Sequence, residues 1–205
     1  MQRLEGFSHI AYDTNVLVYY CFEVNIPEAN PRRFVCAELT PRTKTITETL
    51  KSKGQRITTI LDAYRELQDV VNAAVVKEMN NPRVKKMLGI AENAPVRQQT
   101  VLHVQTAVAK HVKKLKNASW FVLNHEFTPS PTAFASLRTF FDSIPLADLG
   151  DSERASAVDI KLVNFGAVSQ IPLVTNDGGI HKFSGRLQAA GLAYRIYDLK
   201  TLNPS

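Results

Sequence analysis

Short apolar runs typical of strands alternate with longer, helically periodic segments along this chain. A mostly apolar run at residues 7–12 predicts a strand that ends at Asp13, and residues 15–23 favour a helix. A β-branched run at 56–60 predicts a second strand, and residues 61–79 then show one apolar and one polar helical face. This order predicts a mostly parallel sheet with helices on both faces.

The rest of the chain continues the alternation, with one departure in the middle. Residues 82–145 are predicted to form an added helical section with its clearest helix at 97–117, whereas 119–124 fit a strand or a helix. The other predicted elements are a loop at 27–41, helices at 45–53, 132–143, 151–169 and 182–190, and strands at 171–176 and 193–197. We expect a single α/β domain over residues 1–205, with four or five parallel strands sandwiched by helices and a helical insertion at about 82–145.

Acidic residues follow two of the predicted strands. Asp13 comes directly after the first strand, and Asp177 comes directly after the predicted strand at 171–176, in the run Leu173-Val174-Thr175-Asn176-Asp177. Ligand sites in open α/β sheets form beyond the carboxyl ends of the strands, so the two carboxylates are expected at one rim. Carboxylates brought together raise one another's pKa unless a cation neutralises them. The pattern therefore predicts a site for a hard divalent cation with oxygen ligands.

Four short matches, in order along the chain, resemble the PIN-domain nucleases, a family that includes the toxins of many bacterial and archaeal toxin–antitoxin pairs. The matches are Asp13-Thr14-Asn15 after the first strand, Glu66-Leu67 on the helix after the second, Asp159 eighteen positions before Asp177, and Thr175-Asn176-Asp177 itself. The closing segment Tyr194-Arg195-Ile196-Tyr197 and Leu202-Asn203-Pro204 also resembles the family. The resemblance covers residues 7–80 and 145–205, and residues 82–145 are longer than in compact members.

The resemblance implies a PIN-like α/β fold and a metal-dependent endoribonuclease that hydrolyses RNA phosphodiester bonds. It assigns catalysis and Mg²⁺ or Mn²⁺ binding to four acids: Asp13, Glu66, Asp159 and Asp177. Asp151 is a further or alternative ligand, and Asn15 and Thr175 are expected to support the site. RNA is the expected partner; a homodimer and an antitoxin or other protein partner stay open.

Each acid also has a purely structural interpretation. Asp13 fits a helix N-cap, and Glu66 fits a solvated helix face shared with Asp62 and Asp69. Asp159 falls inside a predicted helix, where acids are often exposed, and Asp151 and Glu153 compete with it near the start of that helix. Asp177 precedes Gly178-Gly179, as a turn residue would.

Composition adds a preference for a polyanionic partner. The chain has 205 residues, with 25 Lys and Arg against 19 Asp and Glu, and a formal charge of +6. Such an excess favours nucleic acid. Lys110, Lys113 and Lys114 belong to a basic stripe that would contact an RNA backbone, or would be a solvated helix face. Trp120 is expected in the core rather than stacked on a base.

Cysteine usage and hydropathy bear on the compartment. The two cysteines form no CxxC pair, the N-terminus has no signal-peptide core, and no apolar run is long enough to span a membrane. A cytoplasmic protein without membrane contact is expected.

Two rival functions keep the fold but change the chemistry. The first is a catalytically weak RNA-binding or scaffold PIN protein. The second is a phosphatase with Asp13 as nucleophile, which is disfavoured because the usual second Asp, two positions on, is Asn15 here.

Overall fold

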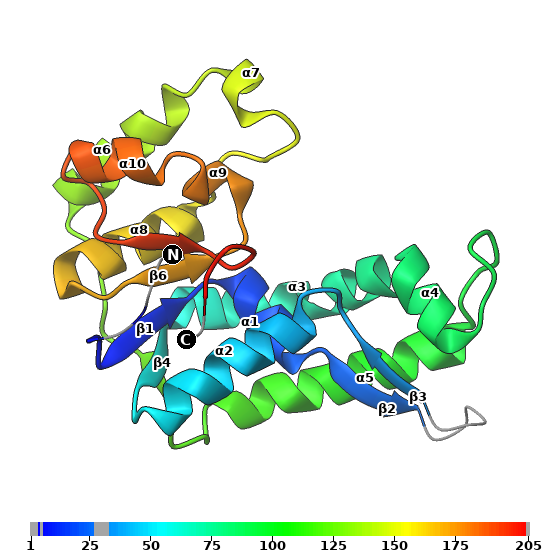
Figure 1. Cartoon of the computed structure of the whole chain (residues 1–205). Helices are drawn as coiled ribbons and strands as arrows, with labels where there is room; N and C mark the ends of the chain where they lie inside the picture. The colour runs from blue at the N-terminus through cyan, green and yellow to red at the C-terminus, as the bar shows by residue number, and fades with distance from the viewer. Residues whose placement is uncertain (1–3, 5, 27–32, 204–205) are drawn as a thin grey trace.

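The computed structural model describes residue 4 and residues 6–26 and 33–203, and the five strands of its main sheet are all parallel (Figure 1). From one edge to the other they are β5 (Phe121–Asn124), β4 (Arg56–Ile60), β1 (His9–Tyr12), β6 (Leu173–Thr175) and β7 (Ile196–Asp198). The α/β class and the parallel, helix-covered sheet predicted from the sequence are confirmed. Their order places β1 and β6, which precede Asp13 and Asp177, next to each other.

Alternate side chains of the strands enter two separate cores. On β1, Ile10 and Tyr12 pack on one face of the sheet, and Ala11 packs on the other. On β6, Val174 packs on the same face as Tyr12, and Leu173 packs on the same face as Ala11. Successive side chains of a strand point to opposite faces, so a sheet buried on both faces has almost continuous apolar strands.

Helices cover both faces of the sheet (Figure 1). On the face of Tyr12 lie α1 (Thr14–Cys21), α2 (Thr40–Ser52), α3 (Leu61–Met79) and α5 (Gln98–Leu115). On the opposite face lie α6 (Pro131–Asp142), α8 (Ala157–Ser169), α9 (Gly178–His181) and α10 (Ser184–Ala189), with the short α7 (Leu146–Leu149) nearby.

An arm extends beyond the sheet on one side of the molecule (Figure 1). It contains parts of α3 and α5 together with α4 (Pro82–Leu88), and an antiparallel hairpin of β2 (Glu23–Ile26) and β3 (Arg33–Cys36). The predicted loop at 27–41 is therefore wrong at 33–36, where the chain pairs with β2, and its part at 27–32 lies outside the described residues. The added section at 82–145 contains α4, α5 and α6, joined by loops, and also β5, which resolves the ambiguity at 119–124 in favour of an edge strand.

Several predicted helix bounds change because of local capping. The helix predicted at 45–53 begins earlier, at Thr40, with Pro41 in its first turn, where the missing N–H of proline costs nothing. The helix predicted at 151–169 begins only at Ala157, because Ser156 and Asp159 form a reciprocal capping box. The helix predicted at 182–190 is replaced by α9 and α10.

Two further expectations concern the cysteines and the membrane. Cys21 and Cys36 are both free thiols, the first buried and the second half-buried. Within the described ranges, no helix is long and apolar enough to cross a bilayer.

Candidate functional site

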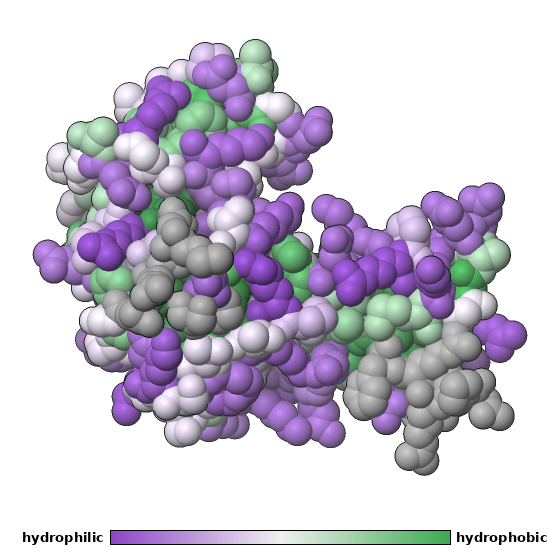
Figure 2. Space-filling model, viewed as in Figure 1, coloured by the Kyte–Doolittle hydropathy of each residue, from purple (hydrophilic) through white to green (hydrophobic). Residues whose placement is uncertain are grey.

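A cavity of about 330 Å³ lies beyond the carboxyl ends of β1 and β6. Figure 2 shows that the molecule is hollowed between the part that carries α9 and the arm that carries α4. The walls of the cavity come from these same two parts, with α3 on one side and residues 153–159 on the other. Its acidic lining residues are Asp13, Glu66, Glu153, Asp159 and Asp177. All four acids of the predicted set thus line one cavity.

Asp13 is the most deeply buried of these acids, with 1% of its surface exposed. It stands at the N-cap position of α1, but its side chain makes no capping hydrogen bond. Instead, its Oδ2 accepts a hydrogen bond of 2.7 Å from the hydroxyl of Thr175. Its Oδ1 is buried and has no hydrogen-bond partner in the described part of the chain. A helix cap therefore does not account for Asp13, because a buried oxygen without a partner is costly.

Thr175 connects Asp13 to Asp177. Its hydroxyl donates to Asp13 and accepts a hydrogen bond of 2.9 Å from the backbone N–H of Asp177. Asp177 in turn caps α9, with its Oδ1 accepting from the N–H of Gly179 at 2.5 Å. Asp177 is thus a helix N-cap rather than a free turn residue, and Thr175 bridges it to Asp13. Asn176 is half-buried and donates from its side chain to the hydroxyl of Tyr19.

Asp159 lies in the first turn of α8 and not inside a longer helix as predicted. Its Oδ2 accepts a hydrogen bond of 2.7 Å from the N–H of Ser156, whose hydroxyl accepts from the N–H of Asp159. The capping box orients the carboxyl group, and Asp159 is 9% exposed despite its charge. The first turn of α8 therefore aims at the cavity rather than at solvent.

Glu66 reaches the cavity from α3, one to two turns after the end of β4. Its Oε2 accepts a hydrogen bond of 2.6 Å from the hydroxyl of Thr14, which directly follows Asp13. Asp69, on the same predicted polar face, is exposed and does not line the cavity. Asn15 lines the cavity but is exposed, and the hydrogen bond to the carboxylate of Asp13 comes from Thr175.

A loop that precedes α8 supplies a fifth acid, Glu153, which sequence reasoning named only as a competitor. Asp151 is exposed and is not among the residues that line the cavity. The loop approaches α9 so closely that a Cβ at Gly179 would collide with the carbonyl oxygen of Glu153. A Cβ at Gly178 would similarly collide with the hydroxyl of Ser152. The two glycines were a signal for this close approach.

The carboxylates perturb one another. Burial raises the pKa of Asp13 well above its ordinary value, and the charges of Asp159 and Asp177 raise it further against the opposing Thr175 hydrogen bond. Burial also raises the pKa of Asp159, as do Asp177 and Glu66, while its hydrogen bonds to Ser156 oppose the shift. Burial raises the pKa of Asp177 too, against its hydrogen bond from Gly179. The ionised form of these carboxylates is therefore disfavoured, first by burial and then by the charges of the neighbouring acids.

Three helix N-termini offset part of this charge. Asp13 and Asp177 are the N-cap residues of α1 and α9, and Asp159 is in the first turn of α8. The positive end of a helix dipole stabilises a carboxylate in this position, within about one turn. The same three ends would also favour a bound phosphate near the carboxylates.

The donor set suits a hard divalent cation, which takes carboxylate oxygens and water. The buried, unpartnered Oδ1 of Asp13 and the raised pKa values fit such an ion at this cavity. Among the described residues, however, no three His, Cys, Asp or Glu side chains are already close enough together to hold an ion. The carboxylates line a common cavity without forming a finished coordination shell.

The basic stripe lies elsewhere. Lys110, Lys113 and Lys114 are exposed on α5, and none of them lines the acidic cavity. The cations that do line it are Lys77 of α3 and Arg154 of the 153–156 loop. A polyanion at the acidic cavity would meet these two side chains first.

Comparisons of the chain with models of known protein families, with curated proteins and with solved structures found no significant match. The functional argument therefore depends on the geometry of the cavity and on the short motifs that line it.

Proposed function

We propose that this protein is a Mg²⁺- or Mn²⁺-dependent endoribonuclease of the PIN type. The observation that carries the proposal is the buried Oδ1 of Asp13, which lacks a hydrogen-bond partner within the described residues and belongs to a cavity lined by further carboxylates. A buried carboxylate without a counter-charge is unstable unless it is protonated or binds a cation. A divalent cation would supply the missing partner of Asp13 and would bind the further carboxylates of the cavity, and the same cation would serve in catalysis.

Asp13, Glu66, Asp159 and Asp177 would hold the ion, and Glu153 would be an additional acid at the rim. When bound, such an ion lowers the pKa of a water ligand and neutralises charge on a phosphate. The hydroxyl of Thr175 orients Asp13, and the hydroxyl of Thr14 orients Glu66. These two hydrogen bonds fix one oxygen of each carboxylate, which limits the rotation of the carboxylate groups.

Lys77 and Arg154 would position the phosphates of the substrate. Both are exposed and line opposite walls of the cavity. Arg154 is anchored by hydrogen bonds from its Nη1 to the carbonyl oxygens of Phe141 at 2.6 Å and Asp142 at 3.2 Å. A guanidinium has five N–H donors, so an anchored arginine still has donors for a phosphate. Single-stranded RNA fits an open cavity with acids at its base and cations at its rim.

The decisive experiment measures cleavage of an end-labelled single-stranded RNA with Mn²⁺, with Mg²⁺ and with EDTA. Asp13→Asn is expected to abolish Mn²⁺-dependent cleavage, because an amide keeps the shape of the side chain but removes its charge. Mn²⁺ binding, measured by calorimetry without RNA, is expected to weaken in the same variant.

Asp69→Asn is the matched control, because Asp69 is an exposed acid on the helix of Glu66 that does not line the cavity. The control is expected to cleave RNA and bind Mn²⁺ like the unmodified protein. Cleavage that persists undiminished in Asp13→Asn would reject the proposal.

A second candidate is an RNA-binding or scaffold protein that retains the acids without catalysis. One observation favours it, namely that no metal-holding group of three side chains is preformed in the described ranges. This candidate predicts RNA binding that EDTA leaves unchanged, together with no cleavage in Mn²⁺. The cleavage assay in Mn²⁺, together with a measurement of RNA binding with and without EDTA, therefore separates the candidates.

A further inference from the structure

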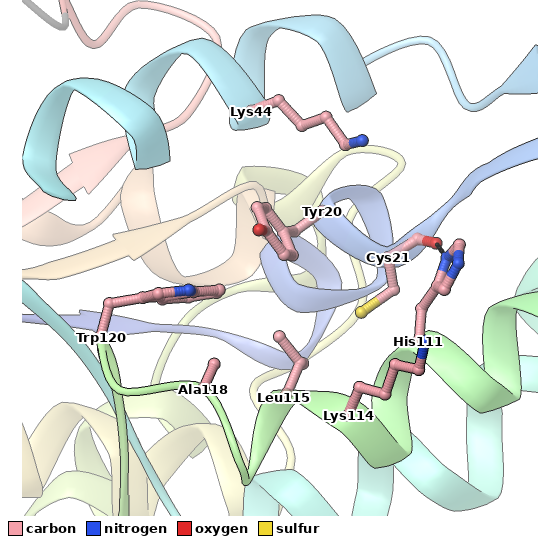
Figure 3. A pocket seen from close by; sticks show the side chains of 8 residues that line it. All are labelled: Tyr20, Cys21, Lys44, His111, Lys114, Leu115, Ala118 and Trp120. Atoms are coloured by element: carbon pink, nitrogen blue, oxygen red, sulfur yellow. Dashed lines mark hydrogen bonds between the residues drawn. The ribbon is translucent and has the colours of Figure 1, made fainter. Parts of the chain in front are cut away.

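A second cavity, of about 250 Å³, lies at the opposite end of α1 from the acids. Figure 3 shows Trp120 on one side of it, His111 and Lys114 on the other, and Lys44 and Tyr20 above. Leu115 and Ala118 lie below and between them. The cavity thus combines an apolar base, two aromatic rings and three basic side chains from α1, α2, α5 and the segment before β5.

The indole of Trp120 is held in place but is not buried in the core as the sequence predicted. Tyr20 packs against it edge-on, with the ring centroids 5.2 Å apart. The ammonium group of Lys51 lies 5.1 Å from the indole centroid. Trp120 itself remains half-exposed, whereas the adjacent Phe121 is buried in the core. A fixed, accessible indole is a surface on which a planar base can stack.

The basic side chains surround the aromatic pair. His111 is oriented by a hydrogen bond of 2.9 Å between its Nδ1 and the carbonyl oxygen of Cys21. Lys44 is half-buried and forms an ion pair with Glu23, and Lys114 is exposed. Considering only the residues that the structure describes, no Asp or Glu lines this cavity. Its lining therefore attracts an anion.

We propose that this cavity binds a nucleotide, with the base against Trp120 and the phosphate at Lys114, Lys44 and His111. Pockets for drug-sized ligands are about 300–1,000 Å³, so this smaller cavity suits one nucleotide rather than a larger cofactor. An inorganic anion would use the cations but leave the rings unused, and an apolar ligand would leave the cations unused. A free mononucleotide and an unpaired nucleotide of an RNA strand share the required chemistry. Binding of a nucleotide in this cavity does not depend on the acidic cavity.

Trp120 is the single tryptophan of the chain, so fluorescence excited selectively at tryptophan reports this cavity alone. The experiment titrates the full-length protein, in EDTA, with uridine 5′-monophosphate, uridine, inorganic phosphate and a single-stranded hexanucleotide RNA. Saturable quenching is expected with the monophosphate, the RNA or both, and tighter than with uridine or phosphate. Quenching by the RNA alone assigns the site to a strand, and quenching by the monophosphate assigns it to a single nucleotide.

Lys114→Ala is expected to weaken the affinity for the nucleotide about tenfold, since a hydrogen bond to a charged group is lost. Lys113→Ala is the matched control, because Lys113 is an exposed neighbour on α5 that does not line the cavity. Trp120→Leu, followed by calorimetry, tests the stacking without a fluorescent probe and is expected to lose binding.

Three outcomes would overturn the proposal. The first is the absence of saturable quenching by the monophosphate and the RNA up to about 10 mM. The second is binding of inorganic phosphate as tight as that of the monophosphate, which would leave no role for the rings. The third is an equal loss of affinity in Lys113→Ala and Lys114→Ala, which would indicate general surface charge.

Discussion

The two cavities at the ends of α1 carry opposite charge. The N-terminal end gathers the carboxylates of Asp13, Asp159 and Asp177, and the C-terminal end gathers basic side chains such as Lys44 and Lys114. α1 has 8 residues, so its ends lie about 12 Å apart. In each cavity the charge has the sign that the nearby end of a helix dipole stabilises.

Charge alone is therefore a weak guide to function in either place. Acids at helix N-termini and lysines at helix C-termini stabilise many proteins without forming a site. Each cavity has one feature that the helix dipoles do not explain. In the acidic cavity it is the buried, unpartnered Oδ1 of Asp13, and in the basic cavity it is the half-exposed indole of Trp120. If both features are functional, RNA cleavage belongs to the acidic cavity and nucleotide binding to the basic cavity. The predictions below test this division.

The largest expected contrast is between Asp177→Asn and Lys114→Ala in RNA cleavage. Asp177→Asn retains an N-cap oxygen for Gly179 but loses the charge that we propose binds the metal, so the rate in Mn²⁺ is expected to fall by at least about 100-fold. Lys114→Ala is expected to change the rate less than about threefold at saturating RNA, because it does not line the acidic cavity. Initial rates on one labelled RNA measure both. Similar losses in the two variants would contradict the division.

Thr175→Val should weaken metal binding in the acidic cavity, with a smaller effect than that of Asp177→Asn. It removes the hydroxyl that donates to Asp13 and accepts from the N–H of Asp177. Loss of such a supporting group costs about 10–100-fold in metal affinity. Calorimetric titration with Mn²⁺ measures the change. Thr49→Val, which removes an exposed hydroxyl on α2, is the control and should bind Mn²⁺ normally.

Without metal, the stability of the protein should fall as the pH rises from about 4 to 9. Because the folded-state pKa of Asp13 lies above its unfolded value, the stability it contributes is fully present below the unfolded pKa and is lost as the pH rises through the folded pKa. Asp159 and Asp177 shift in the same direction. A fall of at least about 3 °C in Tm is expected in EDTA, since 1 kcal/mol corresponds to about 2–4 °C at this size.

Two additions sharpen this pH experiment. Asp13→Asn should flatten the dependence on pH, because the amide does not titrate. Mn²⁺ should raise Tm most at high pH, where the carboxylates are deprotonated. A Tm in EDTA that rises steadily to pH 9 would show that these acids are already neutralised within the folded chain.

The smallest expected effect lies in the basic cavity. Glu23→Gln removes the partner of Lys44 and should tighten the binding of uridine 5′-monophosphate about twofold, the range of a partly exposed ion pair. Fluorescence of Trp120 measures the affinity. A weaker affinity in Glu23→Gln would mean that the ion pair positions Lys44 for the phosphate.

Much of the fold could be predicted because its signals are local. β4 and α3 have the predicted bounds, since a β-branched run and a helical apolar stripe each lie within one segment. The hairpin of β2 and β3 was missed because Glu23–Ile26 follows a helical run with no Gly or Pro between them, and its pairing partner lies beyond a stretch that contains prolines. The start of α8 was predicted at residue 151 because of the polar residues there. The Ser156–Asp159 capping box instead begins the helix at Ala157.

The sequence by itself determined the parallel α/β class and the position of Asp13 and Asp177 after strands of that sheet, because strand ends and helical periodicity are properties of short segments. Only the tertiary structure decided that Glu153 rather than Asp151 lines the cavity, through the approach of its loop to Gly179. It also decided that Lys114 borders Trp120 and not the acids. Such neighbours are set by how helices pack across the sheet, and packing joins residues that lie far apart along the chain.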